Sequence, residues 1–360
     1  MNSFKYHMPT RIVYGSASFK SVEKYLENRK ILIVTSQGTL NRGVLESVIS
    51  GENHIQNIIA NIPSHPDLED LKLSYELIEH NKIDLILAVG GGSVLDAAKF
   101  FSVYQVGKGV ETVENILKGK SKDNYQRIPI LSVPTTAGTG SEITPWATIW
   151  ERQSKQKYSL HLPDLFSETA IYDPELTLSV PKQLTIQTGL DTLSHALESI
   201  WNKNASQITV DYAVKSIQLI IEFLPKLIND LNNIEYRDNI MKACMYAGLA
   251  FSNTQTAIAH AMSYYITMHK GIDHGIACSF TLPMIVDEAI GQYEFVDTAL
   301  KGAFGELSSR PLRHFMNNLE VSTEFEDYDI SKWDLEQILN SLKNNQRSGN
   351  SLIDIKLLPE

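Results

Sequence analysis

The chain has 360 residues, of which 43% are hydrophobic and 21% are charged, and its formal net charge is −10. This length and apolar content suffice to bury a sizeable core and predict a globular protein of two domains. The acidic balance, without a long basic run to offset it, argues against a nucleic-acid partner.

The sequence shows no sign of export or of insertion into a membrane. Residues 1–9 lack the apolar segment of a signal peptide, and no run approaches the roughly 18 to 20 apolar residues that span a bilayer. The two cysteines, Cys244 and Cys278, each stand in an apolar context. We therefore expect neither a disulfide framework nor a thiolate metal site. We expect the protein to be located in a reducing cytoplasm.

Apolar runs alternate with amphipathic segments through the first part of the chain. This alternation predicts a mostly parallel sheet that is covered by helices on both faces. The expected strands are residues 12–14, 30–35, 55–62, 83–89 and 128–133, and the expected helices are residues 19–26, 40–49 and 67–81.

A strand that ends in three glycines is a candidate phosphate site. The expected strand 83–89 runs into Gly90, Gly91, Gly92 and Ser93, which open a helix. Free backbone N–H groups at a helix N-terminus, together with the helix dipole, favour a phosphate. An ordinary strand-to-helix turn is the alternative, because such a short glycine motif is weak by itself.

A second loop of small residues strengthens the phosphate interpretation. The expected strand 128–133 ends in the loop 134–142, where Thr135, Thr136 and Thr139 offer hydroxyls to a phosphate or to a nicotinamide. Both loops follow the carboxyl ends of strands, where open α/β sheets bind their ligands.

The second half of the chain has a different pattern. Aromatic and β-branched residues between 143 and 172 predict a hairpin, and helical periodicity dominates after residue 184. Pro181 marks the expected boundary between an α/β domain of residues 1–181 and a helical domain of residues 182–360. The polar stretch 343–350 is expected to be mobile.

Four potential metal ligands stand in the helical half. Asp191 and His195 are four residues apart in an expected helix, so they project from one face. His260 and His274 follow, fourteen positions apart across a break that contains Gly271. A carboxylate oxygen and three imidazole nitrogens suit a divalent first-row ion such as Fe(II) or Zn(II). Each residue alone is more often structural, but jointly, and with the glycine-rich loops, they predict a metal site.

These motifs resemble those of the iron-containing, or group III, alcohol dehydrogenases over nearly the whole chain. Four motifs stand in the family's order: Gly90-Gly-Gly-Ser-x-x-Asp96-x-x-Lys99, Pro134-Thr-Thr-x-Gly-Thr-Gly-Ser-Glu142, Asp191-x-x-x-His195 and the pair His260 and His274.

The resemblance implies the fold of this family and of dehydroquinate synthase: a Rossmann-like α/β dinucleotide-binding domain followed by an all-α domain. It implies that the four metal-ligand candidates hold Fe(II), and that NADPH or NADH lies in a cleft between the domains. The residues expected to bind this cofactor are Ser36, Gly90, Gly91, Gly92, Ser93, Asp96, Thr135, Thr136 and Thr139.

Two positions depart from the family's pattern. Many members carry a second His four residues after the first ligand of the later pair, where this chain has Tyr264, so Tyr264 is the candidate replacement in proton transfer. Many NAD-specific members carry Asp after the first long strand, where this chain has Ser36. Because a carboxylate there would repel a 2′-phosphate and a serine would not, Ser36 favours NADPH.

Residues 144–148, 157–160 and 260–265 are most similar to the phosphonoacetaldehyde reductase branch of the family. This similarity implies reduction of phosphonoacetaldehyde to 2-hydroxyethylphosphonate. Besides this small-molecule substrate, the expected partner is a second copy of the chain in a homo-oligomer such as a dimer. A phosphonate requires cations, and the candidates nearest the expected site are Arg152, Lys155, Lys157, His161, His269 and Lys270.

The expected chemistry is direct hydride transfer between nicotinamide C4 and an aldehyde carbon, with the metal as the Lewis acid that polarises the carbonyl. The proton comes from water, from Tyr264 or from the ribose hydroxyls. The alternatives are a general short-chain alcohol dehydrogenase, a dehydroquinate-synthase-like lyase or cyclase, and a metal-bound scaffold without turnover. The lyases carry a richer set of Lys, Arg and Glu around the metal than this chain does.

Overall fold

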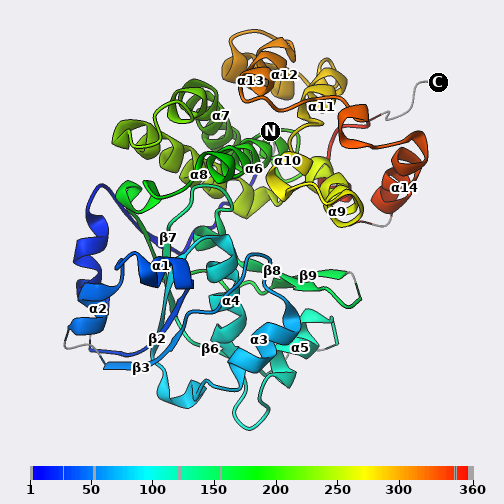
Figure 1. The fold of residues 1–360 in the computed structure, drawn as a ribbon. Helices are drawn as coiled ribbons and strands as arrows, with labels where there is room; N and C mark the ends of the chain where they lie inside the picture. The colour runs from blue at the N-terminus through cyan, green and yellow to red at the C-terminus, as the bar shows by residue number, and fades with distance from the viewer. Residues whose placement is uncertain are drawn as a thin grey trace. The chain divides into compact units, whose positions relative to one another are not determined.

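The computed structural model describes residues 3–26, 28–51, 54–120, 124–154, 156–343, 345 and 347–355. The chain forms two compact units (Figure 1): an α/β unit of residues 9–136 and 141–177, and a helical unit of residues 1–8, 137–140 and 178–360. The short segments join the helical unit through contacts such as Tyr6 Oη to Leu249 O (3.1 Å) and Thr192 Oγ1 to Gly138 O (3.3 Å). The domain boundary expected at Pro181 stays a prediction.

The α/β unit is built on a sheet of six parallel strands, counted over the described residues. Its strand order is β1-β10-β7-β4-β2-β3. The strands are β1 (Arg11–Tyr14), β2 (Lys30–Thr35), β3 (His54–Ile59), β4 (Leu85–Gly90), β7 (Ile130–Pro134) and β10 (Thr169–Tyr172).

The central strands of this sheet are buried on both faces. In β4, Ile86 and Ala88 enter one hydrophobic core, whereas Leu85, Leu87 and Val89 enter the other. A strand that is covered on both faces has a continuous apolar sequence, which is why the parallel sheet was predictable.

The two cores are covered by different elements. Side chains of α3 (Leu68–Tyr75), α4 (Gly92–Ser102), α5 (Glu111–Leu117) and the β8–β9 hairpin cover one face, and those of η1 (Ser18–Tyr25) and α2 (Glu46–Ser50) cover the other. The hairpin pairs β8 (Trp146–Glu151) with β9 (Gln156–His161) and confirms the expected one. The remaining elements of this unit are α1 (Gln37–Asn41), η2 (His80–Lys82), β5 (Val103–Tyr104), β6 (Gln126–Arg127), η3 (Ser141–Ile143) and η4 (Pro174–Thr177).

The helical unit confirms the expected all-α second half. Helices α6, α7 and α8 pack on one another, and α7 begins with a capping box formed by Ser206 and Thr209. None of the described helices is both long and apolar enough to cross a membrane. The elements are α6 (Lys182–Ile200), α7 (Gln207–Leu227), α8 (Ile234–Thr254), α9 (Ile258–Lys270), α10 (His274–Ala277), α11 (Leu282–Ala289), α12 (Glu294–Phe304), α13 (Arg310–Asn318), η5 (Glu326–Tyr328), α14 (Lys332–Lys343) and η6 (Ser348–Asn350).

Three expected elements of the α/β unit differ in extent. The helix expected at 40–49 is interrupted, because Gly43 adopts a left-handed conformation (φ 71°) between α1 and α2. The helix expected at 67–81 ends as α3 at Tyr75, and the strand expected at 55–62 ends as β3 at Ile59.

The stretch 343–350, which the sequence predicts to be mobile, forms hydrogen bonds in its described part, and its mobility stays a prediction. Lys203 N donates to Asn350 O (2.8 Å), and Leu352 N donates to Trp201 O (2.9 Å). These hydrogen bonds hold the segment 347–355 against the end of α6. Residues 344 and 346 lie outside the described residues.

Candidate active site

The predicted phosphate loops lie at one edge of the parallel sheet. Strand β4 lies between β2 and β7, so the residues that follow these three strands are neighbours at their carboxyl ends. Ser36 follows β2, Gly91 follows β4 and Thr135 follows β7. This is the edge at which open α/β sheets bind nucleotides.

The local geometry at Gly91 fits a phosphate. Gly91 is the N-cap of α4, and the first N–H groups of a helix have no partner within the helix. A Cβ at Gly91 would lie 3.3 Å from Thr136 Oγ1, so a side chain there would occupy the space beside this helix N-terminus. The structure thus leaves room for close approach of an anion to the backbone.

Other expected cofactor residues have partners inside the protein. Ser36 Oγ accepts the N–H of Thr39 (3.2 Å) as the N-cap of α1, and Ser93 Oγ accepts the N–H of His65 (3.3 Å). Thr135 is buried, whereas Thr139 is exposed and belongs to the helical unit. Their role in cofactor binding stays a prediction.

Asp96 and Lys99 hold the loop that follows β7. Asp96 accepts the hydroxyl of Ser141 (2.6 Å) and the N–H of Thr148 (2.9 Å). The fully buried Lys99 Nζ donates to Ser141 O (2.5 Å), Ser141 Oγ (3.0 Å) and Trp146 O (2.7 Å). Burial lowers the pKa of Lys99 to about 8. The carboxylate of Asp96 thus serves this loop, a role that its motif did not indicate.

The four predicted metal-ligand residues converge in the helical unit. Nε2 of His195 lies 3.6 Å from Asp191 Oδ1, Nε2 of His260 lies 3.3 Å from it, and Nε2 of His274 lies 3.9 Å from it. Helix α6 supplies Asp191 and His195, α9 supplies His260, and α10 supplies His274. Three imidazoles around one carboxylate oxygen form a donor set of the kind that divalent first-row metals prefer.

Close packing of α10 on α6 places His274. A Cβ at Gly275 would lie 2.0 Å from Gln187 O, so only glycine permits this approach. Gln187 Nε2 also donates to Asp273 Oδ2, which fixes the N-cap of α10. The chain turns between α9 and α10 at Gly271, whose left-handed conformation (φ 69°) ends α9.

Glu198 orients His260 and was not identified from the sequence. Its Oε2 lies 2.6 Å from His260 Nδ1, and its Oε1 accepts the backbone N–H groups of Ala259 (2.6 Å) and His260 (3.2 Å). The carboxylate is fully buried at the N-terminus of α9. Metal-binding histidines typically donate their second ring N–H to such a carboxylate, which fixes the tautomer.

His195 is held mainly by stacking. Its ring stacks on Phe251 (centroids 4.0 Å apart) and on His260 (4.6 Å apart). Its Nδ1 has no hydrogen-bond partner among the described residues.

The electrostatics leave His195 and Asp191 in forms that suit metal binding. Burial lowers the pKa of His195 to about 4, so this imidazole is neutral at physiological pH. Burial disfavours the Asp191 carboxylate, but the surrounding histidines outweigh it and hold the pKa of Asp191 well below its usual range. Burial would also lower the pKa of His260, but the carboxylates of Glu198 and Asp191 raise it. Neutral imidazole and ionised carboxylate are the ligand forms that metals require.

Cys278 also lies in this cluster, although we expected neither cysteine near a metal site. Its Sγ lies 3.6 Å from Asp191 Oδ1, and donor atoms of Asp191, His260, His274 and Cys278 all lie within 4.8 Å of one another. Burial and the Asp191 and Glu198 carboxylates raise the pKa of the thiol well above its usual value. The thiol donates to the Asp191 carboxylate.

Tyr264 and Arg347 lie beside the cluster. Tyr264 follows His260 by one turn of α9, and burial raises the pKa of its phenol to about 12. Arg347, from the C-terminal segment, places its Cζ 5.4 Å from the centroid of the Tyr264 ring. Arg347 could not be singled out from the sequence, because it lies 83 positions from Tyr264 along the chain.

Most of the cations expected to bind a phosphonate have other contacts. Lys270 forms an ion pair with Asp334 (2.9 Å), and His269 stacks on Tyr265. Lys157 lies over the ring of Trp150, and the ring of His161 packs against Trp146. Arg152 Nε lies 3.9 Å from Asp67 Oδ2. Lys155 lies outside the described residues.

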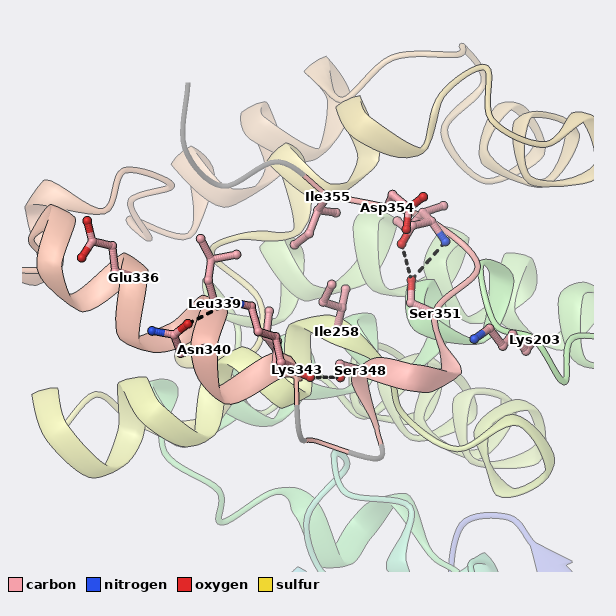
Figure 2. A pocket seen from close by; sticks show the side chains of 12 residues that line it. Lys203, Ile258, Glu336, Leu339, Asn340, Lys343, Ser348, Ser351, Asp354 and Ile355 are labelled. Carbon is pink, nitrogen blue, oxygen red and sulfur yellow. Dashed lines mark hydrogen bonds between the residues drawn. The ribbon is translucent and has the colours of Figure 1, made fainter. Parts of the chain in front are cut away.

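A cavity of 630 Å³ lies elsewhere in the helical unit, between α14 and the C-terminal segment (Figure 2). Its polar lining combines acidic and basic side chains, including Glu336, Asp354, Lys203 and Lys343. None of the predicted metal ligands lines it, so we do not assign it to the reaction.

Comparison with known proteins identifies the family. Residues 9–174 match the family model for iron-containing alcohol dehydrogenases, and residues 185–351 match the model for the C-terminal domain of the Fe-containing alcohol dehydrogenase family. The chain therefore belongs to the iron-containing alcohol dehydrogenase family. It is an oxidoreductase of the alcohol dehydrogenase type that works with a nicotinamide cofactor.

Individual relatives differ in their substrates. The chain is 31% identical to choline dehydrogenase of Bacillus subtilis over 75% of this chain and 69% of that protein. It is 27% identical to sulfoacetaldehyde reductase of Bilophila wadsworthia over 92% of this chain and 90% of that protein. The crystal structure of sulfoacetaldehyde reductase from Bifidobacterium kashiwanohense in complex with NAD+ is similar with a TM-score of 0.87 at 25% identity, covering 99% of this chain and 96% of that one.

Proposed function

We propose that this alcohol dehydrogenase is a metal-dependent reductase of short aldehydes whose metal ligands are Asp191, His195, His260 and His274. The observation that carries the proposal is the convergence of three Nε2 atoms within 3.9 Å of Asp191 Oδ1. The donor set is free of backbone groups and rich in imidazole, which suits Fe(II) or Zn(II), and the family favours iron.

When bound, the metal supplies a Lewis acid that polarises the substrate carbonyl while a nicotinamide provides the hydride. The chain's own contribution is to hold the ligands in place. Glu198 keeps the proton of His260 on Nδ1 and leaves Nε2 facing Asp191. Phe251 fixes the plane of the His195 ring. Tyr264 stands one turn of α9 after His260, and we keep it as the candidate proton donor.

The cofactor in this proposal binds at the carboxyl edge of the sheet. The N-terminus of α4 and the space beside Gly91 support pyrophosphate binding there. Ser36, at the end of β2, supports NADPH because it lacks the carboxylate that repels a 2′-phosphate. The relative from Bifidobacterium kashiwanohense was solved with NAD+, so NADH is the competing cofactor.

The proposed substrate is a short aldehyde with an anionic group, such as phosphonoacetaldehyde. Two relatives that match nearly the whole chain are sulfoacetaldehyde reductases, and their substrate also joins an aldehyde to an anionic group with tetrahedral geometry. The competing proposal is a general short-chain alcohol dehydrogenase.

A substrate panel separates these proposals. The purified enzyme, loaded with Fe(II) or Zn(II), is assayed for oxidation of NADPH and NADH with phosphonoacetaldehyde, sulfoacetaldehyde and propanal. We expect higher kcat/KM for the two anionic aldehydes. Equal or higher kcat/KM for propanal would leave the general alcohol dehydrogenase, and no metal-dependent oxidation of either cofactor would reject the reductase.

A further inference from the structure

Arg347 lies next to the elements that carry the proposed metal ligands. Its Nη1 donates to Thr256 Oγ1 (3.1 Å), two residues before α9 begins, and its guanidinium lies over the ring of Tyr264. Figure 2 shows other residues of the same C-terminal segment. Ser348 and Ser351 line a cavity together with Ile258, the first residue of α9. The segment therefore brings a cation to the start of the helix that carries His260.

The guanidinium keeps most of its capacity for an anion. Over the described residues, Arg347 forms no ion pair with a carboxylate and has one side-chain hydrogen bond, the one to Thr256. A guanidinium offers five N–H donors in a planar fork that matches two oxygens of one anion. The side chain is half-buried, so a ligand can reach it in surroundings that strengthen the charge interaction.

We infer that Arg347 determines substrate specificity by binding the anionic phosphonate or sulfonate group of the aldehyde. The inference rests on the proposed function and names the residue that selects its substrate class. An aldehyde of two carbons carries its anionic group next to the carbonyl, so the cation that recognises it must lie close to the metal ligands. It must also offset the Asp191 and Glu198 carboxylates, which repel an anionic substrate. Arg347 lies over the ring of Tyr264, one turn of α9 after His260, and its charge is opposite to that of the two carboxylates.

A purely structural role for Arg347 has a matched control in Lys203, which contacts the same segment. Lys203 Nζ donates to Gly349 O (2.6 Å), and Asn350 Nδ2 donates to Thr256 O (2.9 Å), so other contacts also hold the segment. Lys203→Gln removes one positive charge and one contact to the segment without touching Tyr264. A loss that comes only from loosening the segment would appear in Lys203→Gln as well.

The test compares wild type, Arg347→Gln, Arg347→Lys and Lys203→Gln as metal-loaded enzymes with NADPH. Because charge-assisted bidentate contacts are lost, we expect Arg347→Gln to lower kcat/KM about 100-fold for phosphonoacetaldehyde and sulfoacetaldehyde and less than about threefold for propanal. Arg347→Lys should lose about tenfold on the anionic aldehydes, because a lysine keeps the charge but not the fork. Lys203→Gln should match wild type on all three.

A binding measurement reports on the same contact without turnover. Calorimetric titration of the metal-loaded proteins with 2-hydroxyethylphosphonate should give an affinity that Arg347→Gln weakens and Lys203→Gln preserves. Equal losses on anionic aldehydes and propanal, or unchanged 2-hydroxyethylphosphonate affinity in Arg347→Gln, would overturn the role of Arg347 while leaving the reductase in place. A wild-type enzyme that reduces propanal but neither anionic aldehyde would overturn the substrate proposal and the inference together.

Discussion

Glu198 and His260 join helix α6 to the first turn of α9 through one carboxylate. Oε2 of Glu198 lies 2.6 Å from His260 Nδ1, while Oε1 accepts the backbone N–H groups of Ala259 and His260. A negative charge at a helix N-terminus stabilises the helix, and the same charge fixes the imidazole tautomer. The contact therefore couples the fold of α9 to the direction of the proposed ligand atom.

Replacing Glu198 by glutamine should weaken metal binding more than it weakens the fold. A glutamine still accepts a backbone N–H but no longer provides a charged partner for His260 Nδ1, and loss of such a partner typically costs about 10- to 100-fold in metal affinity. Competition of the protein with a chromophoric chelator measures this affinity. The control is Glu222→Gln on the exposed surface of α7, which should keep wild-type affinity. Unchanged affinity in Glu198→Gln would show that this carboxylate only caps α9.

Ser36→Asp should shift the cofactor preference toward NADH. Aspartate is as good an N-cap as serine, so α1 should be retained. A carboxylate facing a 2′-phosphate costs on the order of one to a few kcal/mol, so kcat/KM should fall at least about fivefold with NADPH and change little with NADH. If the ratio of the two kcat/KM values does not move, Ser36 does not face the ribose.

Gly91→Ala should weaken cofactor binding without unfolding the α/β unit. The backbone at Gly91 is extended (φ −75°), which alanine adopts, but the added Cβ would lie 3.3 Å from Thr136 Oγ1 in the space proposed for the pyrophosphate. We expect the Kd for NADPH, measured by fluorescence titration, to rise about tenfold, equivalent to about 1.4 kcal/mol. Gly302→Ala in α12, where a Cβ meets only Val214 at 3.8 Å, is the control. Wild-type affinity in Gly91→Ala would place the pyrophosphate elsewhere.

Lys99→Met should destabilise the α/β unit. The substitution keeps the apolar stem but leaves the buried carbonyls of Ser141 and Trp146 without their donor. Removing one partner of a buried polar network costs about 3 kcal/mol. Urea unfolding followed by circular dichroism measures the loss, and the exposed Lys108→Met should unfold like wild type. Equal urea midpoints for Lys99→Met and Lys108→Met would mean that water replaces the ammonium of Lys99 as the donor to the two carbonyls.

Features encoded by local pattern were predictable from the sequence. The apolar run 85–89 indicates a strand buried on both faces, and β4 has that environment. The spacing of Asp191 and His195 places both on one face of α6, as the structure confirms. These inferences need only the helix and strand periods.

Features that depend on tertiary contacts were not predictable. Glu198 faces His260 across 62 positions of the chain, and Arg347 faces Tyr264 across 83. Cys278 stands in an apolar sequence that resembles ordinary core, and only the packing of the helices shows that its thiol lies beside Asp191. The C-terminal segment has a polar composition, from which its hydrogen bonds to the end of α6 could not be predicted.

The most direct test of the central claim is the metal content of purified wild type, His195→Ala, His274→Ala and the control His314→Ala, whose side chain is exposed. Elemental analysis after loading with Fe(II) or Zn(II) should find about one ion per chain in wild type and His314→Ala, as expected for a single site with nitrogen and oxygen ligands. His195→Ala and His274→Ala should lose most of the metal while the α/β unit keeps its affinity for NADPH. Full metal content in both ligand variants would contradict the proposed site.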